Sequence, residues 1–106
     1  MSSAERAAEN ESTFRELNEQ LEQRAAELEL GESRTPYLCE CHDERCTNVV
    51  LLTRDEYERV RANPRTFVLA PGHQASQDAV VEDGSTFVIV EKTGAEGPLV
   101  EQRYPR

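Results

Sequence analysis

Three cysteines stand within eight residues, in the pattern Cys39-x-Cys41-x4-Cys46, and the chain contains no others. Alternate residues of an extended strand point to the same side, so Cys39 and Cys41 can present two thiolates to one ion. The turn that follows can bring Cys46 back to the same point. Zinc accepts thiolate and favours four ligands in a tetrahedron. The pattern therefore predicts a Zn2+ site in a small knuckle, with buried structural cysteines or a redox pair as the alternatives.

The fourth ligand has two candidates among the side chains, because the chain contains two histidines, His42 and His73. His42 directly follows a predicted ligand, so its side chain is expected to leave a strand on the opposite side. His73 follows Pro71-Gly72, a pair typical of a tight turn. We therefore predict that His73 completes the site. His42 and a water molecule are the alternatives.

The fourth position also decides whether such a site is structural or catalytic. Three thiolates and an imidazole make a closed, structural site. An open site with a water beside Glu40, Asp43 or Glu44 can instead support hydrolysis. The sequence contains neither the zinc deaminase pattern nor the His-Glu-x-x-His pattern of zinc proteases. The expectation is therefore a protein that is not an enzyme.

Residues 1–34 predict one amphipathic helix. Strong helix formers dominate this segment. We expect the helix to be firm from Thr13, to reach back into residues 4–12 and to end at Gly31, with residues 1–12 solvated or frayed. Its predicted buried stripe either packs on the rest of the chain or forms a coiled coil with a second copy or another protein. The stripe consists of Phe14, Leu17, Leu21, Ala25 and Leu28.

The remaining residues predict short strands and one short helix. Thr53 and Glu56 form a capping box that opens the helix, which Asn63-Pro64 closes. Strands are expected at 37–41, 48–52 and 66–70, in a hairpin of 79–81 with 86–91, and in a short edge strand at 99–104. The fold class is therefore α+β: a long N-terminal helix, then a small antiparallel sheet with one short helix and a zinc knuckle. We divide the chain into a helical extension, 1–34, and a zinc-knuckle domain, 35–106.

The composition excludes several partners. Twelve basic and 21 acidic residues give a net charge of −9, so direct binding to nucleic acid or an anionic membrane is not expected. The longest apolar runs have four residues, far below the roughly 20 that span a bilayer. The odd cysteine count argues against a disulfide framework. With no signal-like segment at the N-terminus, these features indicate a cytoplasmic location.

Further motifs follow the cysteine cluster: Leu52-Thr53-x-x-Glu56-Tyr57-Glu58-x-Val60-Arg61, Asn63-Pro64-x-x-Phe67 and Ala70-Pro71-Gly72-His73. With these motifs the chain resembles, over about residues 4 to 106, a family of small actinobacterial proteins with a Cys-x-Cys-x4-Cys cluster and a Pro-Gly-His turn. The resemblance implies a free-standing cytoplasmic protein whose cysteines and turn form one unit.

The functional hypothesis is a non-enzymatic, zinc-stabilised protein-interaction or regulatory protein. Its acidic N-terminal helix would be the docking element, either for a basic surface of another protein or for self-association. The alternatives are a small zinc or thiol enzyme and a redox sensor that releases zinc when its thiols are oxidised.

Overall fold

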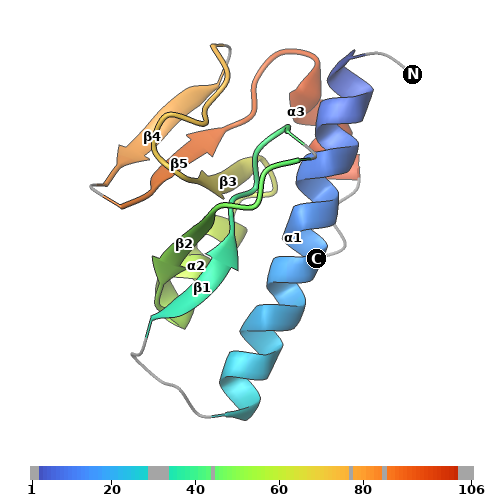
Figure 1. Cartoon of the computed structure of the whole chain (residues 1–106). Coiled ribbons are helices and arrows are strands. Elements are labelled where there is room, and N and C mark those ends of the chain that lie inside the picture. The colour runs from blue at the N-terminus through green and yellow to red at the C-terminus, as the bar shows by residue number, and fades with distance from the viewer. Residues whose placement is uncertain (1–2, 29–33, 44, 77, 85, 103–106) are drawn as a thin grey trace.

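One long helix lies beside two small antiparallel sheets in the computed structural model (Figure 1). The structure describes residues 3–28, 34–43, 45–76, 78–84 and 86–102. This arrangement confirms the predicted α+β class. The elements in chain order are α1 (Ser3–Glu27), β1 (Thr35–Leu38), β2 (Val49–Leu52), α2 (Arg54–Arg61), β3 (Thr66–Leu69), β4 (Ala79–Asp83), β5 (Val88–Glu91) and α3 (Glu96–Gln102).

The strands divide into a two-stranded ribbon and a three-stranded sheet. In the ribbon, β1 pairs with β2, from Thr35 opposite Leu52 to Leu38 opposite Val49. The sheet has the order β3-β5-β4, with a bulge in β4. The backbone N–H of Glu40 donates to the carbonyl of Val68 at 2.8 Å, which joins the end of the ribbon to the sheet. Figure 1 shows α2 behind the ribbon and α1 beside it.

Two apolar clusters cover opposite faces of the three-stranded sheet. Along β3, Phe67 and Leu69 belong to one cluster and Val68 to the other, as expected for a strand whose successive side chains alternate. One cluster also contains Cys39 and residues of α1 and α3, and the second lies under the ribbon and α2. The cysteines therefore lie at the edge of a core.

The buried face of α1 is mostly polar, which corrects the predicted stripe. Leu17 is 42% exposed and Leu28 is 56% exposed, while Phe14 and Leu21 are half-buried. Of the predicted stripe, Ala25 alone is fully buried. The buried residues of α1 repeat at the heptad-like spacing that was expected. Most of them, however, are polar and lie against polar groups of the rest of the chain. The residues buried along α1 are Ala8, Glu11, Arg15, Asn18, Glu22 and Ala25.

Specific partners explain why polar side chains are buried there. Arg15 donates to the carbonyl oxygens of Pro64 and Thr66, and its guanidinium lies 3.8 Å from the ring centre of Phe67. Asn18 donates to the Leu38 carbonyl at 2.9 Å and accepts from the Leu38 N–H at 2.7 Å. Buried polar groups are stable only when they are paired in this way. The spacing of apolar residues alone therefore cannot predict this buried face.

A buried cluster of Lys92 and three carboxyl groups holds the first turns of α1, which were expected to be solvated. Lys92 lies 2.5 Å from Glu11 and 3.1 Å from Asp78, with Glu96 at 4.0 Å. All four side chains are nearly inaccessible to solvent. The desolvation cost of burying Lys92 is offset by these carboxylates. Residues 3–12 are therefore helical and anchored.

One further prediction is wrong, and one predicted motif is confirmed. The predicted edge strand at 99–104 is wrong, because Glu96–Gln102 form α3 and Val100 packs into the core. Pro98 is compatible with this helix because it lies in the first turn. The predicted capping box of Thr53 and Glu56 is confirmed. The predicted stop at Gly31 lies outside the described residues. No helix within the described ranges has both the length and the apolar character to cross a bilayer.

Candidate metal centre

The knuckle continues directly from the ribbon. The Cys39 N–H donates to the Asn48 carbonyl at 3.0 Å, so the backbone remains extended past the end of β1. A turn closed by the Cys46 N–H and the Asp43 carbonyl, also at 3.0 Å, then reverses the chain. Cys39 and Cys41 enter from one side of this turn and Cys46 from the other, as the spacing predicts.

His73 reaches the knuckle from the turn after β3. Its N–H donates to the carbonyl of Ala70 at 3.1 Å, which closes a four-residue turn. Gly72 has a φ of 86°, a value that favours glycine at the third position of a turn with proline before it. The Pro71-Gly72 pair therefore sets where the imidazole points.

The four predicted ligands lie together. The three Sγ atoms and one ring nitrogen of His73 are all within 4.8 Å of one another. The Nδ1 atom of His73 lies 3.6 Å from the Sγ of Cys39 and 3.6 Å from the Sγ of Cys46. Tetrahedral zinc with ordinary bond lengths separates a nitrogen and a sulfur ligand by about 3.6 Å. The donor types and their spacing therefore fit a zinc ion.

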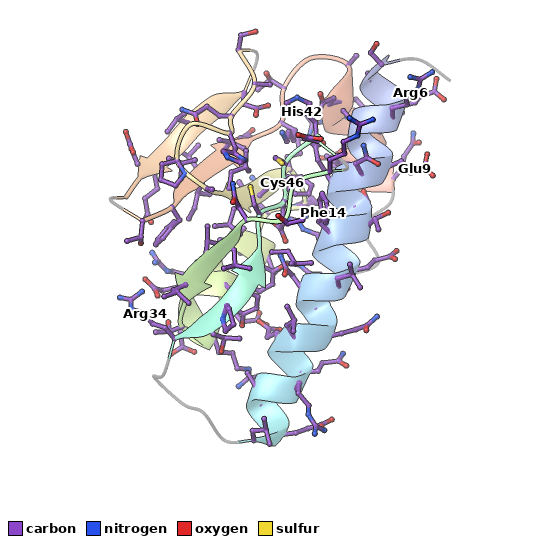
Figure 2. The ribbon with its side chains drawn as sticks, in the orientation of Figure 1. Arg6, Glu9, Phe14, Arg34, His42 and Cys46 are labelled. Carbon is purple, nitrogen blue, oxygen red and sulfur yellow. The ribbon has the colours of Figure 1, made fainter. Side chains whose placement is uncertain are left out.

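His42, the alternative ligand, lies outside this cluster. Figure 2 shows Cys46 and His42 on the loop between β1 and β2, with His42 near α1. The His42 carbonyl accepts a hydrogen bond from the Asn10 side chain at 3.1 Å, and the residue is exposed. The structure thus brings His73, and not His42, to the three cysteines.

Hydrogen bonds around the sulfurs and the imidazole support the cluster. The Ala70 N–H donates to the Sγ of Cys39 at 3.2 Å. The side-chain amide of Asn48 lies 2.9 Å from the Nε2 atom of His73. Asn48 was missed by the sequence analysis. Its only signal was its place two residues after the last cysteine, which is weak.

Burial is uneven across the cluster. Cys39 and Cys41 are each 1% exposed, whereas Cys46 and His73 are half-buried. A hydrogen bond between the two buried thiols raises the pKa of Cys39 and lowers the pKa of Cys41 to about 4. Burial raises the pKa of Cys46. The cluster therefore favours a thiolate in a position where a cation can balance its charge.

The nearby carboxylates are engaged elsewhere. Glu40 is fully buried and accepts hydrogen bonds from the Tyr57 hydroxyl at 2.6 Å, the Asn18 amide at 3.0 Å and the Val68 N–H at 3.0 Å. Asp43 accepts from the N–H of Arg45 at 2.9 Å. Glu44 lies outside the described residues. Glu40 is therefore held within the core by three hydrogen bonds.

A surface hollow of about 560 Å³ lies between the start of α1 and the loop after Cys41. None of the four candidate ligands is among the described residues that line it. The described residues that line this hollow are Ser3, Arg6, Ala7, Glu9, Asn10, His42 and Asp43.

Comparison with protein-family models, with curated proteins and with solved structures gave no match.

Proposed function

We propose that this chain is a non-enzymatic, zinc-stabilised protein-interaction or regulatory protein. The observation that carries the zinc assignment is the convergence of three cysteines and His73 at the separation that tetrahedral zinc requires. Cys39, Cys41, Cys46 and His73 would hold the ion. Three thiolates would more than balance its 2+ charge, and the neutral imidazole would complete the tetrahedron.

A bound ion would add a further link between two parts of the fold that are distant in sequence. Cys39 and Cys41 follow the ribbon, while His73 follows the three-stranded sheet. Closing the chain between these points costs conformational entropy. Metal binding offsets that cost, since the free energy of binding at a structural zinc site becomes free energy of folding. The ion would therefore fix the ribbon against the sheet.

The absence of catalysis is supported by the donor set. Four protein ligands complete the coordination of zinc and leave no position for a reactive water. The engagement of Glu40 with Tyr57 and Val68 removes the nearest buried base from consideration. A small zinc or thiol enzyme is therefore the weaker alternative.

The redox-sensor alternative has one observation in its favour. Cys46 and His73 are half-buried, so an oxidant can approach the cluster from this side. Zinc-bound thiolates that reach solvent can be oxidised and release their ion. We retain this function as the second candidate, to be tested by zinc release after treatment with hydrogen peroxide.

The docking role rests on α1 and the charge of the chain. Glu9, Glu16 and Glu27 are exposed along α1, and the net charge is −9. This charge favours a partner protein with a basic surface over nucleic acid. We also propose that the protein is cytoplasmic and that it belongs to the actinobacterial family that it resembles.

Cobalt substitution tests the structural role of the site. Reduced, metal-free protein titrated with Co2+ should develop the visible absorption of a tetrahedral thiolate site, saturating at one ion per chain. Added azide should leave this spectrum unchanged, because a closed site has no position for it. A spectrum that shifts with azide would instead identify an open, catalytic type of site. The His42→Ala variant is the matched control and should behave like the wild type.

A further inference from the structure

The outer face of the β1–β2 ribbon is apolar although solvent reaches it. Val49 is 53% exposed and Leu51 is 49% exposed, and the residues between and after them are buried. The register places Leu38 opposite Val49 and Pro36 opposite Leu51. Side chains on directly paired residues share one face. Four apolar side chains therefore form the face of the ribbon that points away from α2.

One flank of α1 continues this apolar character. Phe14, Leu17, Leu21 and Leu28 lie on the same flank of the helix at 100° per residue. The opposite flank carries Glu19, which forms an ion pair with Arg61 of α2. The apolar flank therefore faces away from α2, as the outer face of the ribbon does.

These two faces adjoin because α1 packs directly on β1. The hydrogen bonds between Asn18 and Leu38 hold the two elements together. Leu21 packs against the apolar cluster under the ribbon and lies at the base of the combined surface. Figure 2 labels Phe14 on α1. We call this combined surface the α1–ribbon face. It consists of Phe14, Leu17, Leu21, Leu28, Pro36, Leu38, Val49 and Leu51.

An apolar face of this kind on a strongly charged protein indicates an interaction site. Phe14 and Leu28 are separated by 14 residues, so the helical part extends for about 21 Å. This length corresponds to about four turns of a helix, which would meet it with apolar residues at positions i, i+3, i+4 and i+7. The geometry therefore suits a helical partner segment.

Charge selects between a second copy and another protein. Arg24 is paired with Glu27 at 3.2 Å, and Arg34 with Glu56 at 3.2 Å. The positive charges near the α1–ribbon face are thus already balanced, and the chain carries a net charge of −9. Two copies of this chain would repel each other through this net charge. A partner with lysine or arginine beside its apolar stripe would be attracted.

We infer that the α1–ribbon face binds an amphipathic helix of another protein, with basic residues flanking the apolar stripe of that helix. This inference rests on the proposed interaction role and adds to it the surface and the chemistry of the partner.

A designed peptide tests this directly. The probe is a helix-forming peptide of about 16 leucine and lysine residues with leucine on one face, and its control is a scrambled peptide of the same composition. Binding is measured by fluorescence anisotropy with zinc-loaded, full-length protein at about 0.15 M salt, where long-range charge effects are screened. The patterned peptide should bind at least tenfold more tightly than the scrambled one. Equal binding of both peptides would show attraction by charge alone and would overturn the inference.

Two double variants locate the binding surface. Leu17→Ser with Leu51→Ser should weaken binding of the patterned peptide about tenfold or more, because two apolar contacts are lost. Val80→Ser with Val81→Ser is the control, since these residues are 46% and 54% exposed on β4, outside the α1–ribbon face. Equal affinity of both double variants would overturn the assignment. So would a concentration-dependent dimer that only the first pair disrupts, because the occupant would then be a second copy.

The zinc content and melting temperature of the same samples separate the two proposals. Protein that binds one zinc but does not discriminate between the peptides would overturn this inference alone. Protein that folds without zinc would contradict the proposed function, whatever the peptides do.

Discussion

The side-chain amide of Asn48 lies 2.9 Å from the Nε2 atom of His73, across the ring from the nitrogen that faces Cys39 and Cys46. When Nδ1 binds a metal, Nε2 carries the proton and becomes a hydrogen-bond donor. The Asn48 atom at this distance is Nδ2; a half-turn of the amide puts Oδ1 in its place, and Oδ1 can accept that bond. Outer contacts of this kind fix the orientation of a ligating imidazole. Asn48 is therefore the positioning residue for His73.

Replacing Asn48 by alanine should weaken zinc binding by about 10- to 100-fold without removing the site. Competition with a chromophoric chelator measures the change. Asn48→Asp should recover most of the affinity, because a carboxylate also accepts the bond from Nε2. The neighbouring exposed Thr47→Ala provides the control. Unchanged affinity in Asn48→Ala would show that the ring is oriented by other contacts.

Each of the substitutions Cys39→Ser, Cys41→Ser and Cys46→Ser should unfold most of the chain at room temperature. Binding free energy at structural zinc sites is on the order of 10 kcal/mol, comparable with a total stability of roughly 5–15 kcal/mol. Circular dichroism during heating, with and without added zinc, provides the measurement. Melting temperatures within a few degrees of the wild type for all three variants would contradict a structural role.

Glu11 should make stability dependent on pH. Burial, opposed by Lys92, raises the pKa of Glu11 from 4.5 to about 9 in the folded protein. The unfolded chain therefore releases this proton at lower pH. The contribution of Glu11 to the free energy of unfolding is therefore largest below about pH 4.5 and is lost as the pH rises toward 9.

The Glu11→Gln variant tests this contribution. It should flatten the fall in unfolding free energy between pH 6.5 and 9, which we expect to be about 3 kcal/mol. Urea unfolding of the zinc-loaded protein measures it, and this pH range keeps the metal bound. The exposed Glu9→Gln serves as the control. An equal slope in Glu11→Gln and the wild type would show that Lys92 keeps Glu11 ionised.

Removal of the Tyr57 hydroxyl should destabilise the fold more than removal of the Tyr37 hydroxyl. The two rings stack with centroids 4.3 Å apart, so they make a matched pair. The Tyr57 hydroxyl bonds to the carboxylate of Glu40 at 2.6 Å. The buried Tyr37 hydroxyl has no hydrogen-bond partner of ordinary geometry among the described residues, so its loss should cost little, whereas loss of a bond to a carboxylate costs about 1.5–3 kcal/mol. Denaturant titration of Tyr57→Phe and Tyr37→Phe compares them, and equal losses would show that the bond from Tyr57 to Glu40 does not stabilise the fold.

Local signals in the sequence were sufficient for most elements. The capping box at Thr53, the Pro71-Gly72 turn and the hairpin before β5 depend on neighbouring residues, and all three are present. The grouping of the three cysteines with His73 was also the favoured prediction, because alternate residues of a strand share a side and His42 was expected to point away, although His42 stayed an alternative. These features need no knowledge of distant contacts.

The orientation of α1 could not be predicted in the same way. Its buried face depends on the carbonyl of Thr66, on Leu38 and on Lys92, which are all distant in sequence. Apolar periodicity identifies a buried face only when the opposing surface is apolar. The role of Asn48 could not be predicted for a related reason, because it depends on His73, a distant residue, lying beside it.

Metal analysis tests the central claim most directly. Protein purified under reducing conditions without a chelator should contain one zinc per chain, and His42→Ala should retain it. The His73→Ala variant should lose most of its zinc or bind it far more weakly. Reduced, folded wild-type protein that contains no metal would contradict the account, as would loss of zinc from His42→Ala with retention in His73→Ala.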